Sequence, residues 1–223
     1  MSHQIQPVKT RFAFFKNYSY FIIDLATQAA ALVDPAWDFH KLNSVINGLG
    51  LKLTAILLTH SHYDHVNRVR PMLGHYHPKV YMSRKEIAYY KFKCPNLNPV
   101  EDHDQLALGQ TVITCLETPG HTAGSMCFLL PDALFTGDTI FVEGCGICRG
   151  PGADPWQMYQ SIQMIKERVG PAVKIYPGHS YGKPPGYPLS FLLQENRYFL
   201  FESAAGFVQY RMRPRQTGLL KFK

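Results

Sequence analysis

The sequence predicts a single α/β domain with mixed β-sheets that spans residues 1–223. Short apolar segments typical of strands alternate with amphipathic segments typical of helices, and several strands lie close enough in sequence to form hairpins. The chain of 223 residues is 46% apolar and 17% charged, a composition typical of a globular protein with one sizeable core. No repeat, low-complexity tract or charged linker divides the sequence.

The first third of the chain reads as three strands, one helix and a fourth strand. The three strands are rich in aromatic and aliphatic residues and are expected over residues 12–18, 20–25 and 29–33. A helix is expected from about Asp38, ending at Gly48 or Gly50, because apolar residues recur there at helical spacing. A buried strand over 53–58 then runs towards His60.

The rest of the chain continues the alternation of strands and helices. Further strands are expected over residues 80–82, 111–116, 126–130, 133–135 and 173–176, with a loop containing Pro and Asn after a helix over 84–92. Asp154 is the expected N-cap of another helix, with Pro155 at its first position. Helices from Leu189 close the chain.

Composition and charge disfavour several classes of function. No stretch approaches the roughly 18 consecutive apolar residues of a membrane span, and the polar N-terminus lacks the apolar region of a secretory signal. Five cysteines in no disulfide spacing favour reduced thiols and a cytoplasmic location. No spacing typical of nucleic-acid-binding modules is present, so no nucleic-acid partner is expected.

The formal net charge of +7 is concentrated in part at the C-terminal end. Five basic residues and no acidic ones lie in the last thirteen positions, namely Arg211, Arg213, Arg215, Lys221 and Lys223. Such a segment is either a solvated chain end or a surface that attracts an anionic partner.

The strongest chemical signal is the segment from Thr59 to His65, in which three histidines and one aspartate occupy six positions. In an extended segment His60 and His62 point the same way and can share one metal ion. The chain must then turn, which lets Asp64 and His65 reach a second position. Histidine nitrogens and carboxylate oxygens are zinc ligands, and a catalytic zinc keeps one position for water.

Three further candidate ligands follow apolar strands and lie beside glycines, where tight turns lift side chains into a cleft. They are His121, Asp138 and His179. Each would be an ordinary loop residue on its own, and their significance comes from completing the set. The ligands divide into one set for a first metal (His60, His62 and His121), one set for a second (Asp64, His65 and His179), and Asp138 as a bridge.

In order and spacing, these seven residues resemble the metal motifs of the metallo-β-lactamase superfamily, over residues ~12 to ~200. The resemblance implies a four-layer αββα sandwich with two mixed sheets and a dinuclear metal site at one edge. It also implies two zinc ions, although iron or manganese would suit the same ligands. Asp34 resembles the family's early aspartate, which contacts the metal ligands from behind.

Within the superfamily, residues 137–146 and 176–181 resemble glyoxalase II-like thioester hydrolases. Asp138 argues against a true β-lactamase. After Gly-Cys-Gly, glyoxalase II has a basic residue and then an aromatic that help to hold glutathione, but Ile147 and Arg149 stand at these positions here, whereas Tyr181 is kept. These departures argue against glutathione as the natural thiol carrier.

In length and in residues 194–199, the chain resembles the zinc-dependent hydrolases of bacterial trans-acyltransferase polyketide pathways of the bacillaene type. This resemblance implies an acyl-thioester substrate on the phosphopantetheine arm of an acyl carrier protein. Such carriers are acidic, so the net charge of +7 would attract them. Arg149 and Tyr181 are the expected substrate-binding residues.

The expected reaction is hydrolysis of the thioester by a hydroxide that bridges two zinc ions, because bound zinc lowers the pKa of water towards ~7. Asp64 is the expected catalytic residue, since it can orient the nucleophile or accept its proton. Two alternatives use the same ligand string. They are glyoxalase II (hydroxyacylglutathione hydrolase) and a persulfide dioxygenase that depends on a single iron.

Overall fold

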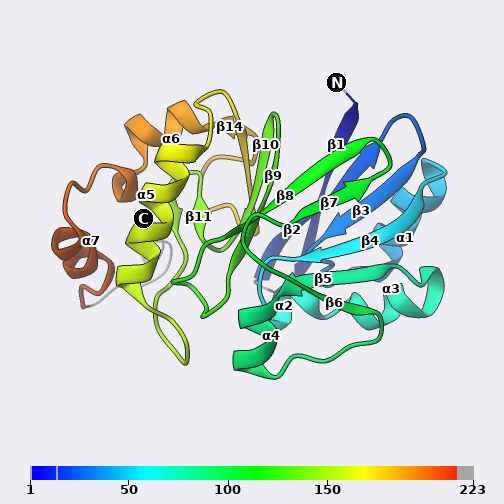
Figure 1. Cartoon of the computed structure of the whole chain (residues 1–223), viewed down its shortest axis with the longest axis horizontal. Helices are drawn as coiled ribbons and strands as arrows, with labels where there is room; N and C mark the ends of the chain where they lie inside the picture. The colour runs from blue at the N-terminus through cyan, green and yellow to red at the C-terminus, as the bar shows by residue number, and fades with distance from the viewer. Residues whose placement is uncertain (1, 14, 215–223) are drawn as a thin grey trace.

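Two six-stranded β-sheets stand face to face, and helices cover the outer side of each (Figure 1). The computed structural model that shows this arrangement describes residues 2–13 and 15–214. Both sheets are mixed, so the four-layer αββα sandwich expected from the sequence is confirmed. Three of the basic residues near the C-terminus, Arg215, Lys221 and Lys223, lie outside the described residues.

The first sheet contains its six strands in sequence order. Its antiparallel part is formed by β1 (His3–Phe12), β2 (Phe15–Asp24) and β3 (Ala29–Val33). Its parallel part continues from β3 through β4 (Lys52–Leu58), β5 (Lys79–Ser83) and β6 (Leu97–Val100). The helices on this side of the molecule are α1 (Phe39–Gly48), α2 (Tyr63–Val66), α3 (Val69–Tyr76) and α4 (Arg84–Tyr90).

The second sheet has the strand order β14-β13-β10-β9-β8-β7. Its strands are β7 (Gln105–Leu108), β8 (Thr111–Glu117), β9 (Met126–Leu130), β10 (Ala133–Gly137), β13 (Lys174–Pro177) and β14 (Tyr187–Pro188). A separate pair is formed by β11 (Ile140–Phe141) and β12 (Gly144–Cys145). The helical elements on this side are α5 (Pro155–Arg168), α6 (Leu189–Glu195), the 3-10 turn η1 (Arg197–Phe199) and α7 (Ala204–Arg211).

Alternating side chains of the central strands build three apolar cores. In β2, Tyr20 and Ile22 pack between the two sheets, whereas Phe21 and Ile23 belong to the core beneath α1 and α3. This division follows from the two-residue period of a strand, which sends successive side chains to opposite faces. Each sheet is therefore buried on both faces, as a four-layer arrangement requires.

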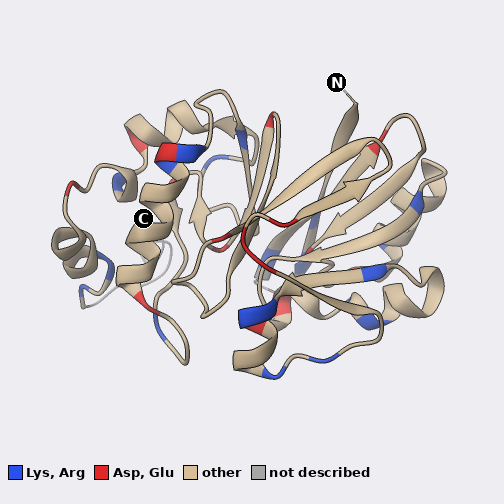
Figure 2. Cartoon of the chain, viewed as in Figure 1, with Lys and Arg blue, Asp and Glu red and all other residues tan. Residues whose placement is uncertain are grey.

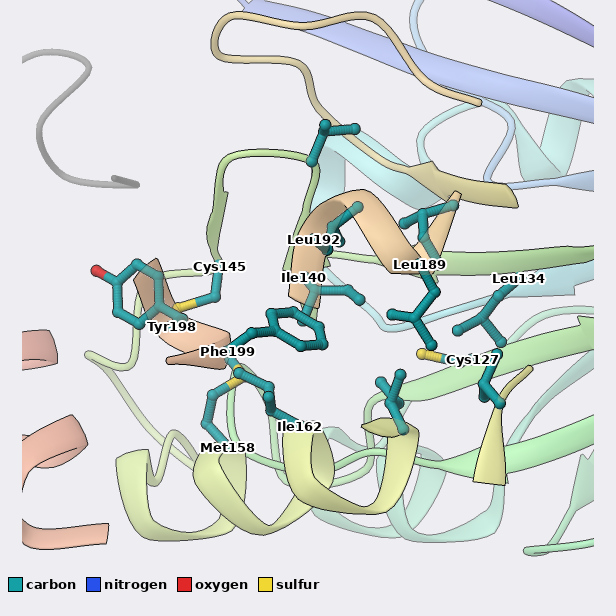
Figure 3. Close-up of a cluster of buried hydrophobic side chains, with 14 of the residues drawn as sticks. Cys127, Leu134, Ile140, Cys145, Met158, Ile162, Leu189, Leu192, Tyr198 and Phe199 are labelled. Carbon is teal, nitrogen blue, oxygen red and sulfur yellow. The ribbon is translucent and has the colours of Figure 1, made fainter. Parts of the chain in front are cut away.

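The third core lies between the second sheet and its helices, where side chains from both layers interdigitate (Figure 3). Cys127 and Leu134 of β9 and β10 belong to it, together with Ile162 of α5 and Leu189 of α6. The predicted N-cap of α5 is confirmed, because Asp154 Oδ1 accepts a hydrogen bond from Trp156 N at 2.8 Å.

The N-terminal hairpin differs from the sequence prediction. Phe12 pairs with Phe15 at the turn, so the strand predicted over 12–18 crosses the hairpin, and β2 continues unbroken to Asp24. Asn17 and Ser19, which are typical turn residues, are buried within β2 because their side chains make tertiary hydrogen bonds. The strands β6 and β7 also replace a predicted loop, since Asn and Pro are tolerated in the short edge strand β6.

No helix among the described residues has both the length and the apolar character that crossing a membrane requires. All five cysteine thiols are free, as the sequence predicts.

A buried carboxylate joins the two sheets at the end of β2. Asp24 Oδ1 accepts hydrogen bonds from Thr27 N (2.9 Å) and Thr27 Oγ1 (2.7 Å). Its Oδ2 accepts hydrogen bonds from Gln110 N (3.0 Å) and Thr111 Oγ1 (2.9 Å) at the turn between β7 and β8. These hydrogen bonds, that from the Thr27 hydroxyl above all, lower the pKa of Asp24 even though burial opposes the shift.

We expect Asp24→Asn to lower the Tm by several degrees at pH 7, because an amide cannot accept all four hydrogen bonds. The pKa of Asp24 is lower in the folded protein than in the unfolded chain, where it is about 3.9. Its stabilising effect is therefore present above that pH and is lost as the pH falls through the folded-state pKa. Thermal unfolding between pH 7 and pH 3 measures the difference in Tm between the wild type and Asp24→Asn. A difference that stays constant below pH 4 would contradict this assignment.

Candidate metal centre

Seven polar side chains meet where four strands of the two sheets end. The chain leaves β4, β8, β10 and β13 at this edge, and each exit carries at least one of His60, His62, Asp64, His65, His121, Asp138 and His179. The sheets are joined here by hydrogen bonds from Met126 N to Thr59 O (2.9 Å) and from Tyr20 Oη to Pro177 O (2.6 Å). All seven residues that the sequence predicts as ligands are therefore neighbours.

Three histidines form the first group. The ligand atoms of His60, His62 and His121 lie within 4.8 Å of one another, and His62 Nδ1 is 3.0 Å from His121 Nε2. His121 Nδ1 donates to the carbonyl oxygen of Ile147 at 2.7 Å, which leaves Nε2 facing the other rings. Within the described part of the chain, the buried Nε2 of His60 has no hydrogen-bond partner.

Asp64, His65 and His179 form the second group, again within 4.8 Å of one another. The Nε2 atoms of His65 and His179 face each other at 3.3 Å, and Asp64 Oδ2 lies 3.3 Å from His179 Nε2. His179 Nδ1 donates to the carbonyl oxygen of Lys16 at 2.7 Å. Both rings therefore present Nε2 to the interior of the cluster.

Asp138 lies between the two groups. Its Oδ1 is 3.4 Å from His65 Nε2, and its Oδ2 is 3.4 Å from His179 Nε2 and 3.7 Å from His121 Nε2. Oδ1 is buried and lacks a hydrogen-bond partner among the described residues. The carboxylate thus lies between the two groups of candidate ligands, and its role as a bridging ligand stays a prediction.

The donor set fits a transition-metal cation. Buried polar atoms are normally hydrogen-bonded, yet here ring nitrogens face one another at 3.0 and 3.3 Å, and two buried ligand atoms lack partners within the described residues. A cation with nitrogen and carboxylate ligands would satisfy these atoms together, and this donor set suits zinc. Iron and manganese accept the same donors.

The electrostatics of the two groups differ. Burial lowers the pKa of His60, and it lowers that of His121 to about 4, so both rings are neutral. For His65 and His179 burial also favours the neutral ring, but the charge of Asp138 and hydrogen bonds to carboxylates raise both pKa values. A metal ion at the second group would therefore replace protons, as ligation generally requires.

Asp34, the residue that directly follows β3, contacts the candidate ligand His65 and the neighbouring Thr59. Its Oδ1 accepts a hydrogen bond from Thr59 N (2.9 Å), and its Oδ2 accepts one from Thr59 Oγ1 (2.6 Å). Oδ2 also lies 2.9 Å from His65 Nδ1. Such a carboxylate–histidine pair fixes the tautomer and the orientation of a metal-binding ring.

Two further residues, Glu86 and Asn17, hold the loops that carry the candidate ligands, and the sequence analysis did not identify either as part of the site. The buried Glu86 of α4 accepts hydrogen bonds from Ser61 N (2.8 Å) and Ser61 Oγ (2.7 Å) through Oε1, and from Gly124 N (2.9 Å) through Oε2. It thereby ties the loop after β4 to the loop that carries His121. Asn17 Nδ2 donates to Asp64 O (2.9 Å) and Asp64 Oδ2 (3.1 Å).

The two expected substrate contacts are placed differently. The ring of Tyr181 packs against His179 and Phe141, with centroids 5.8 and 5.0 Å apart, and so borders the cluster. Arg149 is exposed and donates to the carbonyl oxygen of Arg213 at 3.5 Å, beside the C-terminal segment. A role for Arg149 in substrate binding stays a prediction.

The sequence model of the metallo-beta-lactamase superfamily matches residues 14–179, which include every residue of the cluster. The chain belongs to this superfamily. It is 46% identical over 223 residues to the probable polyketide biosynthesis zinc-dependent hydrolase PksB of Bacillus subtilis (strain 168), covering 100% of this chain and 99% of that protein. The family and fold expected from the sequence are thus confirmed.

More distant relatives share most of the chain. The human hydroxyacylglutathione hydrolase-like protein is 34% identical over 172 residues, or 74% of this chain and 56% of that protein. The solved structure of a metallo-beta-lactamase from Staphylococcus aureus subsp. aureus COL has a TM-score of 0.86 at 26% identity, covering 98% of this chain and 69% of that one. The protein is accordingly a metal-dependent hydrolase with a metal-binding histidine–aspartate cluster.

Replacing Glu86 should weaken metal binding although the residue is no ligand. Glu86→Ala leaves two backbone N–H groups and the Ser61 hydroxyl without their acceptor, which should cost about 1–3 kcal/mol of unfolding free energy. We expect a metal affinity roughly 10–100-fold lower, the size of effect found for residues that orient ligands. Competition with a chromophoric chelator measures it, and Glu86→Gln should fall between the alanine variant and the wild type. Wild-type affinity in Glu86→Ala would show that the tie between the loops is dispensable.

Proposed function

We propose that the protein is a zinc-dependent hydrolase of polyketide biosynthesis that cleaves a thioester on the phosphopantetheine arm of an acyl carrier protein. The observation that carries this proposal is the 46% identity to PksB along the whole chain. The complete cluster of seven candidate ligands supports the hydrolytic part of it. The acyl carrier and the thioester bond come from the resemblance to glyoxalase II-like and trans-acyltransferase pathway hydrolases.

We infer two zinc ions, one held by His60, His62 and His121 and one by Asp64, His65 and His179, with Asp138 between them. Two compact groups of ligand atoms coincide with this division, and a third, formed by Asp34, His60 and His65, overlaps both. Zinc at these positions supplies Lewis acidity and lowers the pKa of a bound water towards ~7.

The chain's own side chains would orient the reactants. Asp64 is the proposed catalytic residue, because Asn17 holds its carboxylate in place and its Oδ2 faces the centre of the cluster. There it can accept a hydrogen bond from the attacking water and then its proton. Tyr181 lies beside His179, where its phenol O–H could donate to the acyl group. A thiolate is a good leaving group, so no strong general acid is required.

Glyoxalase II activity is the second candidate, and the 34% identity to the hydroxyacylglutathione hydrolase-like protein favours it. The loop that follows Gly-Cys-Gly differs from that activity's pattern. The carbonyl oxygen of Ile147 accepts a hydrogen bond from His121, and the Arg149 side chain donates to the carbonyl oxygen of Arg213 near the C-terminus.

Release of free thiol from two substrates distinguishes these activities. The zinc-loaded enzyme should hydrolyse an acyl-phosphopantetheinyl carrier protein with a higher kcat/KM than lactoylglutathione. The opposite preference would assign the protein to glyoxalase II. Hydrolysis of neither, together with oxygen uptake in the presence of a persulfide, would identify the iron-dependent dioxygenase instead.

Metal analysis tests the dinuclear site independently of the substrate. We expect about two equivalents of metal per chain in the wild type, and about one in either His121→Ala or His179→Ala, since each removes a ligand of one group. Asp138→Ala should abolish turnover. The exposed His75 on α3 provides the matched control, and His75→Ala should keep both equivalents. A wild-type protein that binds one equivalent, or an active Asp138→Ala variant, would contradict the dinuclear model.

A further inference from the structure

Four basic residues line a hollow of about 380 Å³ at the N-terminal hairpin. The residues that line it are Lys9, Thr10 and Arg11 of β1, Lys16 of β2, and Asp38 and Lys41 at the start of α1. Asp38 contributes the only carboxylate of this lining, and that group is engaged as the N-cap of α1, where Oδ1 accepts from Lys41 N at 2.9 Å. The hollow therefore has a strongly positive lining.

Two of the four basic residues of this hollow contact neutral groups: Lys41 Nζ donates to the carbonyl oxygen of Lys9 at 2.7 Å, and Lys9 Nζ lies 5.6 Å from the ring centroid of Tyr18. Among the described residues, no ion pair includes Lys9, Arg11, Lys16 or Lys41. Basic residues on α4 behave differently, since Arg84 pairs with Glu101 (2.6 Å) and Lys85 with Glu117 (2.5 Å). Figure 2 shows Lys and Arg on elements of both sheets, and what distinguishes the hollow is that four of these residues line one concavity.

The register of the hairpin brings two of these cations together. Arg11 and Lys16 are directly paired across the antiparallel ladder. Lys9 lies two residues before Arg11, and so on the same face of β1. Like charges directly opposite each other destabilise a sheet, and a bound anion would relieve this repulsion.

The hollow adjoins the metal centre through the same strand. The carbonyl oxygen of Lys16 accepts the hydrogen bond from His179, and the next residue, Asn17, holds Asp64. An aromatic row leads in the same direction: Phe12 stacks on Trp37 (centroids 5.3 Å apart), and Trp37 packs against Tyr63 (6.1 Å), the first residue of α2. Phe12 and Tyr63 are 63% and 70% exposed, so an apolar surface connects the basic hollow with the cluster.

We propose that the basic hollow binds the phosphate of phosphopantetheine while the thioester lies at the metal centre. This inference rests on the proposed function, because the thioester defines what the phosphate is attached to. Phosphate oxygens accept charge-assisted hydrogen bonds from Lys and from the fork of an Arg guanidinium. The exposed aromatic row would cover the less polar part of the arm. The carrier protein is the source of the phosphate, and coenzyme A offers the same group.

Matched thioesters test whether the phosphate is recognised. We would measure kcat/KM for acetyl-phosphopantetheine and for acetyl-pantetheine, which differ only in the phosphate. The wild type should prefer the phosphorylated substrate by roughly tenfold or more, the size of one charge-assisted hydrogen bond. A ratio near one, with both thioesters hydrolysed, would overturn the inference and leave the proposed function standing.

Two double variants with equal loss of charge test where the phosphate binds. In Arg11→Gln/Lys16→Gln the preference for the phosphorylated substrate should fall towards one. The control is Lys52→Gln/Lys79→Gln, which alters exposed residues at the starts of β4 and β5, the ends opposite to those that lead to the metal centre. The control should keep the wild-type ratio. Equal ratios in both double variants would overturn the assignment to the hollow.

Binding without turnover separates this inference from the proposed function. Calorimetry with S-methyl phosphopantetheine, which has no thioester, should give a Kd roughly tenfold weaker for Arg11→Gln/Lys16→Gln than for the wild type or the control. Unchanged affinity would overturn the inference even if no thioester is cleaved. With the acetylated carrier protein and acetyl-coenzyme A as substrates, a preference for the carrier supports it as the source of the phosphate, whereas an equal or higher kcat/KM for coenzyme A assigns the phosphate to the free coenzyme.

Discussion

Five imidazole rings and two carboxylates meet at one edge of the two sheets, and contacts with the surrounding structure fix how three of the rings are oriented. Nδ1 of His65 faces Asp34. Nδ1 of His121 donates to the carbonyl oxygen of Ile147, and Nδ1 of His179 donates to that of Lys16. Because these three nitrogens are engaged, Nε2 of His65 and Nε2 of His179 face each other at 3.3 Å, and Nε2 of His121 faces His62 Nδ1 at 3.0 Å. The fold thus creates an arrangement of donors for which a cation is the natural partner.

That arrangement depends on holding two sheets in a fixed relation. Hydrogen bonds across the gap join Met126 to Thr59 and Tyr20 to Pro177 at the metal edge, and Asp24 joins the sheets elsewhere through the turn between β7 and β8. Glu86 adds a tie between the loops that follow β4 and β8. The ligands therefore come from distant parts of the sequence but are positioned by rigid strands and a few buried polar contacts, which suits a preorganised site.

The features that the sequence predicted correctly are those that depend on residues close together in the chain. The dense histidine segment, the strand-end positions of His121, Asp138 and His179, and helix caps such as Asp154 all depend on residue type and spacing. The part of β1 before Phe12 was missed because its sequence is mostly polar. The turn of the hairpin was predicted wrongly because Asn17 and Ser19 look like turn residues but are buried by contacts with Asp64 and Asp34. Glu86 follows Ser83 in the spacing of a capping box, yet its carboxylate reaches two other loops. The carbonyl groups that orient His121 and His179 leave no trace in the sequence, since every residue has one.

The N-terminal hairpin combines two tasks in one register. Its backbone orients His179 through Lys16, its inward side chain Asn17 holds Asp64, and its outward side chains line the basic hollow. A shift of one residue would exchange the two faces, turning Asn17 outward and a lysine inward. Insertions or deletions before Asn17 would therefore damage the metal centre together with the outer surface. Diversification of specificity in this lineage would have to proceed by replacing outward side chains within a hairpin of constant length.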